Sequence, residues 1–451
     1  MPKFLDLFVG EIRKKRERLK ESLEKGRASS LDDDFKALLV QNWHPLPDGE
    51  IGDLHLVAVD GSRGLREYAN GSRFYVVRAF GLSNEGERFR TLETEAFLAR
   101  GSEEDIGRYI RQKTEFVEME LALKAIPHLR GPRKLILIDG SLYGRMMHLI
   151  RDCPVEGDRG FLLRYMDVYS RLLEACRREG VALVGVGKDS RAEFVRNEFL
   201  NQLFLSELRS LGSSVSLQEI KELEKCVAKI DGRPGVCFEI LAKLKEKYGA
   251  LLDRFEEMMI ERVHSRPDSQ LVLNFAPGPD YCSPVELAAT KQLREDLPRM
   301  AKNPEWYVRR SFKNSLIENR YKKDEFLKYA VNVIQKVLKF PTVVSFHLLL
   351  DRRDTPLRID IPSWVLGSEN TLNTLEKNRL LKDVDDDLEE LICMLRSGYA
   401  GLMDYNVWLK RADEEVKLRR KDMDALYERV LEKELGVTLV HTRGYRRVKY
   451  P

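Results

Sequence analysis

Two aspartates, each followed by glycine and serine, are the residues of this chain whose type and spacing best suit catalysis. Asp60 follows the apolar run 56–59, and Asp139 follows a second run at 135–138. Both runs predict buried strands, and both Asp-Gly-Ser triplets predict turns where the strands stop. If the strands are neighbours in one sheet, about 4.8 Å apart, both carboxylates can reach one cation. The same triplets are also ordinary turn chemistry, because Asp and Ser hydrogen-bond nearby backbone.

Two further acidic positions could join these aspartates. The helix expected over 103–126 carries Glu118 and Glu120, and only one of them can share a face with the catalytic edge of the sheet. We favour Glu120, 19 residues before Asp139, and keep Glu118 as the alternative. Asp360 lies between isoleucines, where an acid is costly to bury unless it is paired or bound to metal. A solvated helix residue and a turn or cap residue are the simpler interpretations of Glu120 and Asp360.

Carboxylates from strands and a helix are the ligands that Mn²⁺ or Mg²⁺ prefer. Two such ions about 3.5–4 Å apart can activate the attacking water and stabilise the leaving 3'-oxygen in phosphodiester cleavage. Lys188 ends the strand expected at 181–187 and could reach the scissile phosphate as a point charge, although an exposed turn lysine is equally compatible. The order of strands and acids resembles a ribonuclease H-like fold, an α/β class with a mixed sheet.

The elements that must position these residues divide the chain into five expected segments. A ribonuclease H-like core is split by a helical insertion, and helices flank it at both ends. We expect further strands at 270–275, 306–312 and 342–350 in the second half of the core. The segments are an N-terminal docking or dimerisation helix (1–45), the first part of the core (46–190), the insertion (191–265), the second part of the core (266–365) and a C-terminal helical region with a short hairpin (366–451).

Composition leaves the partner open. The chain has 451 residues, enough for two or three domains, and Lys plus Arg exceed Asp plus Glu by only 77 to 73. Basic clusters at 13–20 and 444–451 could follow phosphates, although a solvated helix face or charged tail is the more common outcome. The six cysteines lack zinc or disulfide spacing, and no apolar run reaches 18 residues. We therefore expect a cytoplasmic protein that does not contact the membrane.

These motifs together resemble one known family. The stretches LVAVDGSRG, Glu120-Leu121-Ala122, LILIDGSLYG, GVGKDS and RIDIP are similar to those of the NurA nucleases of archaeal DNA end resection, over about 54–403. The resemblance implies a homodimer, a 5' to 3' exonuclease and single-strand endonuclease that depends on Mn²⁺ or Mg²⁺, and partnership with the HerA hexameric translocase. It also implies four metal ligands, namely Asp60, Glu120, Asp139 and Asp360.

One segment departs from that family. Shorter members have a Gly-Tyr-Pro segment followed by an Ala-His pair on a helix, whereas this chain reads GYAGLMDYNVWLKRA over 398–412. Asn406 or Val407 then lies near the expected histidine. His347, in the strand before Asp360, could substitute for it, although a histidine satisfied within the core or at its edge is the simpler interpretation.

Two other classes of function fit parts of the pattern. An actin-like or sugar-kinase-type ATPase also places Asp-Gly after its first strand, but it needs a late glycine-rich turn for adenosine, and we find none. ATP binding measured by calorimetry would separate such an ATPase from a nuclease. A catalytically inactive adaptor for a DNA translocase has no need of the four acids, and all four are present. The sequence therefore favours a deoxyribonuclease that acts on single strands and duplex ends.

Overall fold

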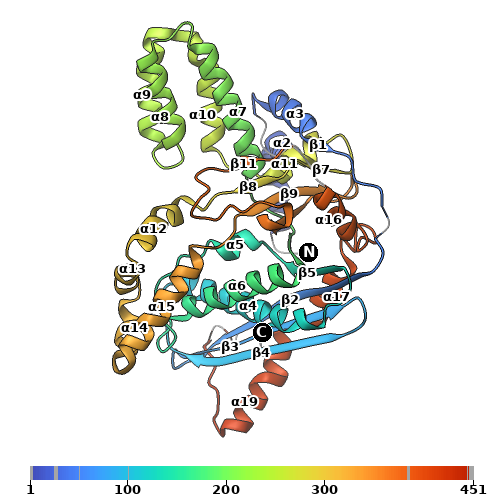
Figure 1. Ribbon diagram of the computed structural model, residues 1–451. Coiled ribbons are helices and arrows are strands. Elements are labelled where there is room, and N and C mark those ends of the chain that lie inside the picture. The colour runs from blue at the N-terminus through green and yellow to red at the C-terminus, as the bar shows by residue number, and fades with distance from the viewer. Residues whose placement is uncertain are drawn as a thin grey trace.

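A mixed β-sheet forms the centre of the protein in a computed structural model that describes residues 4–24, 29–49, 51–99, 101–382, 386–443 and 445 (Figure 1). The sheet has 11 strands, and its main path runs β1-β7-β9-β10-β6-β5-β2-β3-β4. The strands are β1 (Trp43–His44), β2 (Leu54–Glu67), β3 (Arg73–Ser83), β4 (Arg88–Phe97), β5 (Arg133–Asp139), β6 (Val181–Gly187), β7 (Asp280–Cys282), β8 (Val285–Leu287), β9 (Val343–Leu349), β10 (Leu357–Pro362) and β11 (Arg379–Leu380).

Helical crossovers explain why the middle of the sheet is parallel. Helix α4 (Glu103–Ala125) joins β4 to β5, and α6 (Phe161–Glu179) joins β5 to β6. Strand β5 pairs in parallel with both β2 and β6, whereas β2, β3 and β4 form an antiparallel meander. A strand that returns through a helix enters the sheet in the same direction, so its apolar residues are covered on both faces. The predicted α/β class with a mixed sheet is confirmed.

Strand β2 differs from its prediction at one point. It does not turn at the Asp-Gly-Ser triplet but continues to Glu67, paired with β3 along its length. The parallel pairing with β5 ends at Val59, so only one neighbour of β2 stops there. Gly61 lets α4 pack directly on this strand, because a side chain at this position would collide with Glu118 and Thr114 of α4.

The remaining helices surround this sheet. They are α1 (Leu5–Lys14), α2 (Arg16–Glu24), α3 (Asp32–Gln41), α5 (Leu142–Met146), α7 (Phe194–Leu211), α8 (Leu217–Lys229), α9 (Pro234–Tyr248), α10 (Asp253–Val263), α11 (Asp268–Phe275), α12 (Lys291–Lys302), α13 (Pro304–Ser311), α14 (Lys313–Glu318), α15 (Lys323–Val337), α16 (Asp386–Arg396), α17 (Val407–Val416), α18 (Arg420–Asp422) and α19 (Glu428–Leu435). Within the described ranges, no helix has the length and apolar character needed to cross a membrane.

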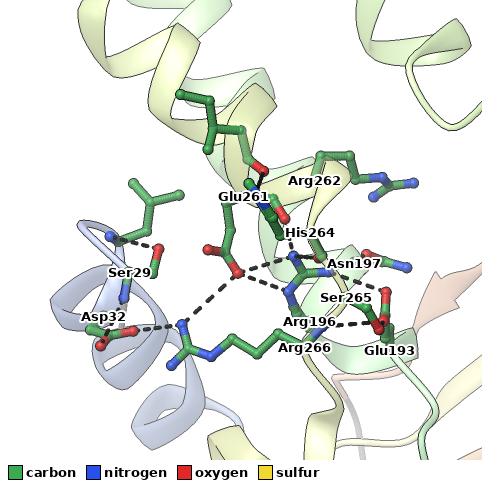
Figure 2. A network of polar contacts seen from close by, with 12 residues as sticks. Ser29, Asp32, Glu193, Arg196, Asn197, Glu261, Arg262, His264, Ser265 and Arg266 are labelled. Carbon is green, nitrogen blue, oxygen red and sulfur yellow. Dashed lines mark hydrogen bonds and ion pairs between the residues drawn. The ribbon is translucent and has the colours of Figure 1, made fainter. Parts of the chain in front are cut away.

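Helices α7 to α10 project from the sheet as a bundle where an insertion was expected (Figure 1). Figure 2 shows the ion pairs at its base, where Arg196 Nη2 lies 3.0 Å from Glu261 Oε1. Arg266 Nη1 lies 2.6 Å from Asp32 Oδ1 and so ties the base to α3. The two arginines are fully buried, so each needs its carboxylate partner. The division of the chain into five segments stays a prediction.

Two of the expected strands are wrong, because residues 270–275 and 306–312 fall largely in helices α11 and α13. In α13, Pro304 occupies the first turn, and the Asn303 side chain accepts a hydrogen bond of 2.9 Å from the Trp306 amide. These are helix-start signals, and they decide against a strand in a short apolar run. The strand expected at 342–350 is confirmed as β9.

Helices lie near both ends of the described part of the chain. Helices α1 and α2 lie within the predicted N-terminal helix, and α19 precedes the last described residues. The predicted hairpin is absent from the described residues 436–443, where His441 makes a single bridge to Tyr68. Most of the basic cluster at 444–451 lies outside the described residues.

Candidate active site

Asp60 and Asp139 lie side by side on one face of the sheet. Val59 pairs with Ile138 in the parallel β2–β5 ladder, and the next residue on each strand therefore points to the opposite face. Asp60 is only 7% exposed, while Asp139, the last residue of β5, keeps a quarter of its side chain accessible. The predicted proximity of the two aspartates is thus present, but Asp60 lies within a continuous strand.

The structure reverses the choice between the two glutamates of α4. Glu118 is 4% exposed and lies against Gly61, the residue after Asp60. Glu120 is half-buried, and a helix turns by about 200° over two residues, so its side chain points away from Glu118. Helix phase was the deciding signal, because Thr114 and Glu118 share the face that packs on Gly61. The selection of Glu120 is corrected to Glu118.

The acids of the site repel one another. Burial and then the charges of Asp139 and Glu118 raise the pKa of Asp60 to about 7, against one hydrogen bond of 2.7 Å from the Gly61 amide. Burial also raises the pKa of Glu118 to about 7, although the Arg145 guanidinium opposes this shift. A cation bound between these carboxylates would relieve both effects.

Basic side chains hold two of the three acids. Lys188 Nζ lies 2.9 Å from Asp139 Oδ2, as expected for a lysine at the end of β6. Burial lowers the pKa of Lys188, but the Asp139 carboxylate outweighs this effect and holds it above the ordinary value. Arg145 Nη2 forms an ion pair with Glu118 and donates a 3.0 Å hydrogen bond to the Asp139 carbonyl. Arg145 therefore fixes the acid of α4 relative to the end of β5.

Tyr405 is a residue of the site that the sequence interpretation missed. The Lys188 ammonium lies 4.6 Å from the centre of its ring. Burial and the charge of Asp139 raise the pKa of Tyr405, so its hydroxyl keeps its proton. That hydroxyl is buried and has no hydrogen-bond partner of normal geometry among the described residues. Its neighbour Asn406 was the available signal, since an asparagine before an apolar helix is a typical cap and fixes where Tyr405 must lie.

Asp360 does not join the other acids. It pairs with Gly185, which pairs with Ile138, so its side chain lies on the face opposite to Asp60 and Asp139. The carboxylate already accepts five hydrogen bonds. The donors are the Ser141 and Ser345 hydroxyls, the Tyr143 amide, and Nε and Nη2 of Arg358. The prediction of Asp360 as a metal ligand is corrected: this residue anchors the turn that follows Asp139.

The two additional candidates are His347 and Asn406. His347 is fully buried on the Asp360 side of the sheet, and burial lowers its pKa to about 3. The Asn406 side chain accepts a 3.1 Å hydrogen bond from the Leu409 amide and caps α17. Helix α17 carries Asp413, and the charge of Asp413 contributes to the raised pKa of Asp60.

The donor chemistry of this site fits a hard divalent cation. Asp60, Glu118 and Asp139 supply carboxylate oxygens, and the unpartnered Tyr405 hydroxyl borders the same space. The arrangement is not a finished coordination shell, because no group of three or more His, Cys, Asp or Glu in the described part of the chain has metal-site geometry. The Lys188 ammonium group instead forms an ion pair with Asp139 Oδ2, so an ion that binds this oxygen must displace it.

Comparisons with known proteins identify the family and the fold of this chain. The NurA domain model matches residues 54–418. The DNA double-strand break repair nuclease NurA of Pyrococcus furiosus is 24% identical over 180 residues, which are 36% of this chain and only 39% of that protein. The crystal structure of the NurA nuclease from Sulfolobus solfataricus superposes with a TM-score of 0.52 at 14% identity, covering 97% of this chain and 98% of that one. That likeness shows a shared fold, and the domain match over most of the sequence shows that the chain belongs to the NurA family.

Proposed function

We propose that this protein is a deoxyribonuclease that depends on a divalent metal and acts in the repair of DNA double-strand breaks. The observation that carries the proposal is the convergence of Asp60, Glu118 and Asp139 beside Lys188. Family membership supports the nuclease assignment, and the name of the Pyrococcus furiosus relative supports the repair context.

Each residue of the site has a distinct task in this proposal. Asp60, Glu118 and Asp139 would hold Mn²⁺ or Mg²⁺, which supplies an activated water and neutralises charge on the phosphate. Lys188, once drawn from Asp139, would contact a non-bridging phosphate oxygen as a point charge. The protonated Tyr405 hydroxyl would donate a hydrogen bond to the substrate. Arg145 is a positioning residue, because it binds Glu118 and the Asp139 backbone at once.

We extend the proposal to the finer activity and the partners. It includes two metal ions, 5' to 3' exonuclease and single-strand endonuclease activity, a homodimer, and a HerA-type hexameric translocase. The resemblance of the motifs supports these points. Helix α1 supports the partner assignments, because it buries no residue and exposes Phe4 (72%), Leu7 (62%) and Phe8 (60%). Apolar side chains gathered in this way mark a protein contact.

Neutralising one acid at a time tests the proposed site. Asp60→Asn and Asp139→Asn should each lower Mn²⁺-dependent cleavage of single-stranded DNA by about 100-fold or more, because each removes a charged ligand. Calorimetry should show weaker Mn²⁺ binding in both variants. Asp189→Asn is the matched control, since this exposed acid follows Lys188 but contacts no other acid of the site. Cleavage by either test variant at the control's rate would rule out this site.

A further inference from the structure

We propose that a hollow formed by Arg151, Arg299, Trp306 and Arg310 binds one nucleotide of a DNA strand that extends from the active site. We call it the arginine–tryptophan hollow. It has a volume of about 180 Å³ and is also lined by Leu149, Gln292, Asp296, Tyr307 and Ser311. The inference rests on the proposed function and names a binding site for its substrate away from the acids.

The indole of Trp306 is suited to stacking on a base. Its side chain is 44% exposed, which is unusual for a large aromatic residue without a partner element. The Arg310 guanidinium lies 5.2 Å from the ring centre, one helical turn further along α13. Aromatic rings flanked by arginine bind single strands without base preference, because every base offers a π-face.

The charges of the hollow favour a phosphate. Arg299 is paired with Asp296 at 3.0 Å, and the neighbouring Arg309 of α13 is paired with Glu305 at 2.7 Å. Arg151 and Arg310 differ from them, since neither has a carboxylate at ion-pair distance in the part of the chain that the structure describes. Two exposed guanidinium groups without acidic partners, next to an aromatic face, match the phosphate and base of one nucleotide.

The hollow is held in place by contacts of α13 and α14 with the segment after α5. The Tyr307 hydroxyl donates a 3.1 Å hydrogen bond to the Ile150 carbonyl, directly before Arg151. The Asp152 carboxylate accepts hydrogen bonds from the Asn314 and Ser315 amides at 2.7 and 3.1 Å. These contacts fix Arg151 relative to Trp306 and Arg310 before any ligand arrives, so little ordering is needed on binding.

A second hollow adjoins the first at the N-terminal half of α4, the helix that carries Glu118 further along. It has a volume of about 210 Å³ and shares Leu149 and Arg151 with the first. Arg108 and Gln112 of α4 line it, and Glu118 lies ten residues beyond Arg108 on the same helix. Ten residues of helix span about 15 Å, which a few nucleotides of a single strand can cover. A strand with its scissile phosphate at the acids can therefore reach Arg151.

Binding of an oligothymidine strand of about 20 nucleotides in EDTA tests the inference without cleavage. Arg151→Gln combined with Arg310→Gln should weaken binding about ten-fold and lower the dependence of log Kd on log salt by about 0.7, since the hollow binds one phosphate and each phosphate contact contributes about 0.7. Trp306→Leu should weaken binding to a similar extent, whereas Trp306→Phe should keep most of it. Arg309→Gln is the control, because its guanidinium is already paired.

Two results would overturn the inference. One is an unchanged affinity and salt dependence in the double arginine variant, and the other is equal binding of heparin and oligothymidine, which would indicate a general anion surface. Cleavage of dinucleotides with Mn²⁺ separates this inference from the proposed function, because such substrates are too short to reach the hollow. Wild-type protein and all variants should cleave dinucleotides alike. If they do so and the variants also bind the long strand as the wild type does, the hollow does not bind DNA, but the proposed function stands.

Discussion

The helical phase of α4 places Glu118, and not Glu120, beside Asp60. Glu118 packs on Gly61 and binds Arg145, while Glu120 points away from them. Glu118→Gln should therefore lower nuclease activity and Mn²⁺ affinity by about 100-fold, because it removes a charged oxygen ligand. Glu120→Gln is the matched control and should keep both. Calorimetry and a single-strand cleavage assay on the pair would expose an error in the helix phase if the two results were exchanged.

The raised pKa of Asp60 predicts a dependence of stability on pH in the metal-free protein. Its pKa is about 7 in the folded protein against 3.8 ordinarily, so the folded state binds the proton more tightly than the unfolded chain. The charged form then costs stability progressively from about pH 4 to pH 7, by an amount on the order of 4 kcal/mol above pH 7.

Asp60→Asn should consequently raise Tm in EDTA more at pH 8 than at pH 5, because the amide has no charge to bury. Thermal unfolding at the two pH values measures this difference. Saturating Mn²⁺ should remove the advantage of the variant, since the ion favours the charged aspartate. An equal gain at both pH values would mean that Asp60 is ionised without cost.

The sequence identified some residues of this site better than others. Asp60, Asp139 and Lys188 follow apolar runs, so their position at the ends of those runs follows from strand periodicity alone, although β2 itself continues past Asp60. Tyr405 and Glu118 were harder, because a tyrosine in a loop and a glutamate on a helix are placed by tertiary packing. Asp360 was misassigned for a related reason: its buried setting was correctly expected, but its pairing with Arg358 depends on the sheet face it occupies.

At the scale of elements, close contact between β2 and α4 depends on Gly61. Gly61→Ala should destabilise the protein by about 1–3 kcal/mol, because the added methyl group collides with Glu118 and Thr114. It should also weaken Mn²⁺ binding by moving Glu118. Gly107→Ala on α4 is the control, since a methyl group there meets nothing within 4 Å and should stabilise the helix. Denaturant unfolding of both variants would refute the packing explanation if Gly61→Ala were neutral.

The elements predicted wrongly share one physical property. Residues 270–275 and 306–312 each contain a short apolar run, at 271–273 and 306–308, and such runs have the same composition in a buried strand and in a buried helix. Capping residues settle the matter in α13, and in α11 the Asp268 carboxylate accepts hydrogen bonds from the Val195 and Arg196 amides, far away in sequence. The long periodic helix α4 needed no such contact and was predicted nearly to the residue.

At the scale of the whole molecule, α1 provides an exposed apolar face for assembly. Leu7→Ser combined with Phe8→Ser should reduce dimerisation or capture of a HerA-type translocase, because it removes two apolar side chains that the single chain leaves in water. Cleavage of short single strands should persist. Sedimentation and pull-down measure the effects, with Leu217→Ser on α8 as a control of similar exposure. If the double variant has the same mass in sedimentation and captures the translocase as well as the wild type, the contact lies elsewhere. Helices α7 to α10 are then the next surface to test.

The ion pair between Lys188 and Asp139 gives the protein an internal counterion. In the metal-free state the ammonium group neutralises one of the acids, and so metal and lysine compete for the same carboxylate. In the proposed nuclease, a phosphate of DNA would draw Lys188 away from Asp139 and leave this carboxylate free to hold the ion. The binding of DNA and of metal would then be thermodynamically linked, each raising the affinity for the other by the same factor. In such an enzyme, all three acids of the site would be free to hold the ion only when a DNA strand is bound.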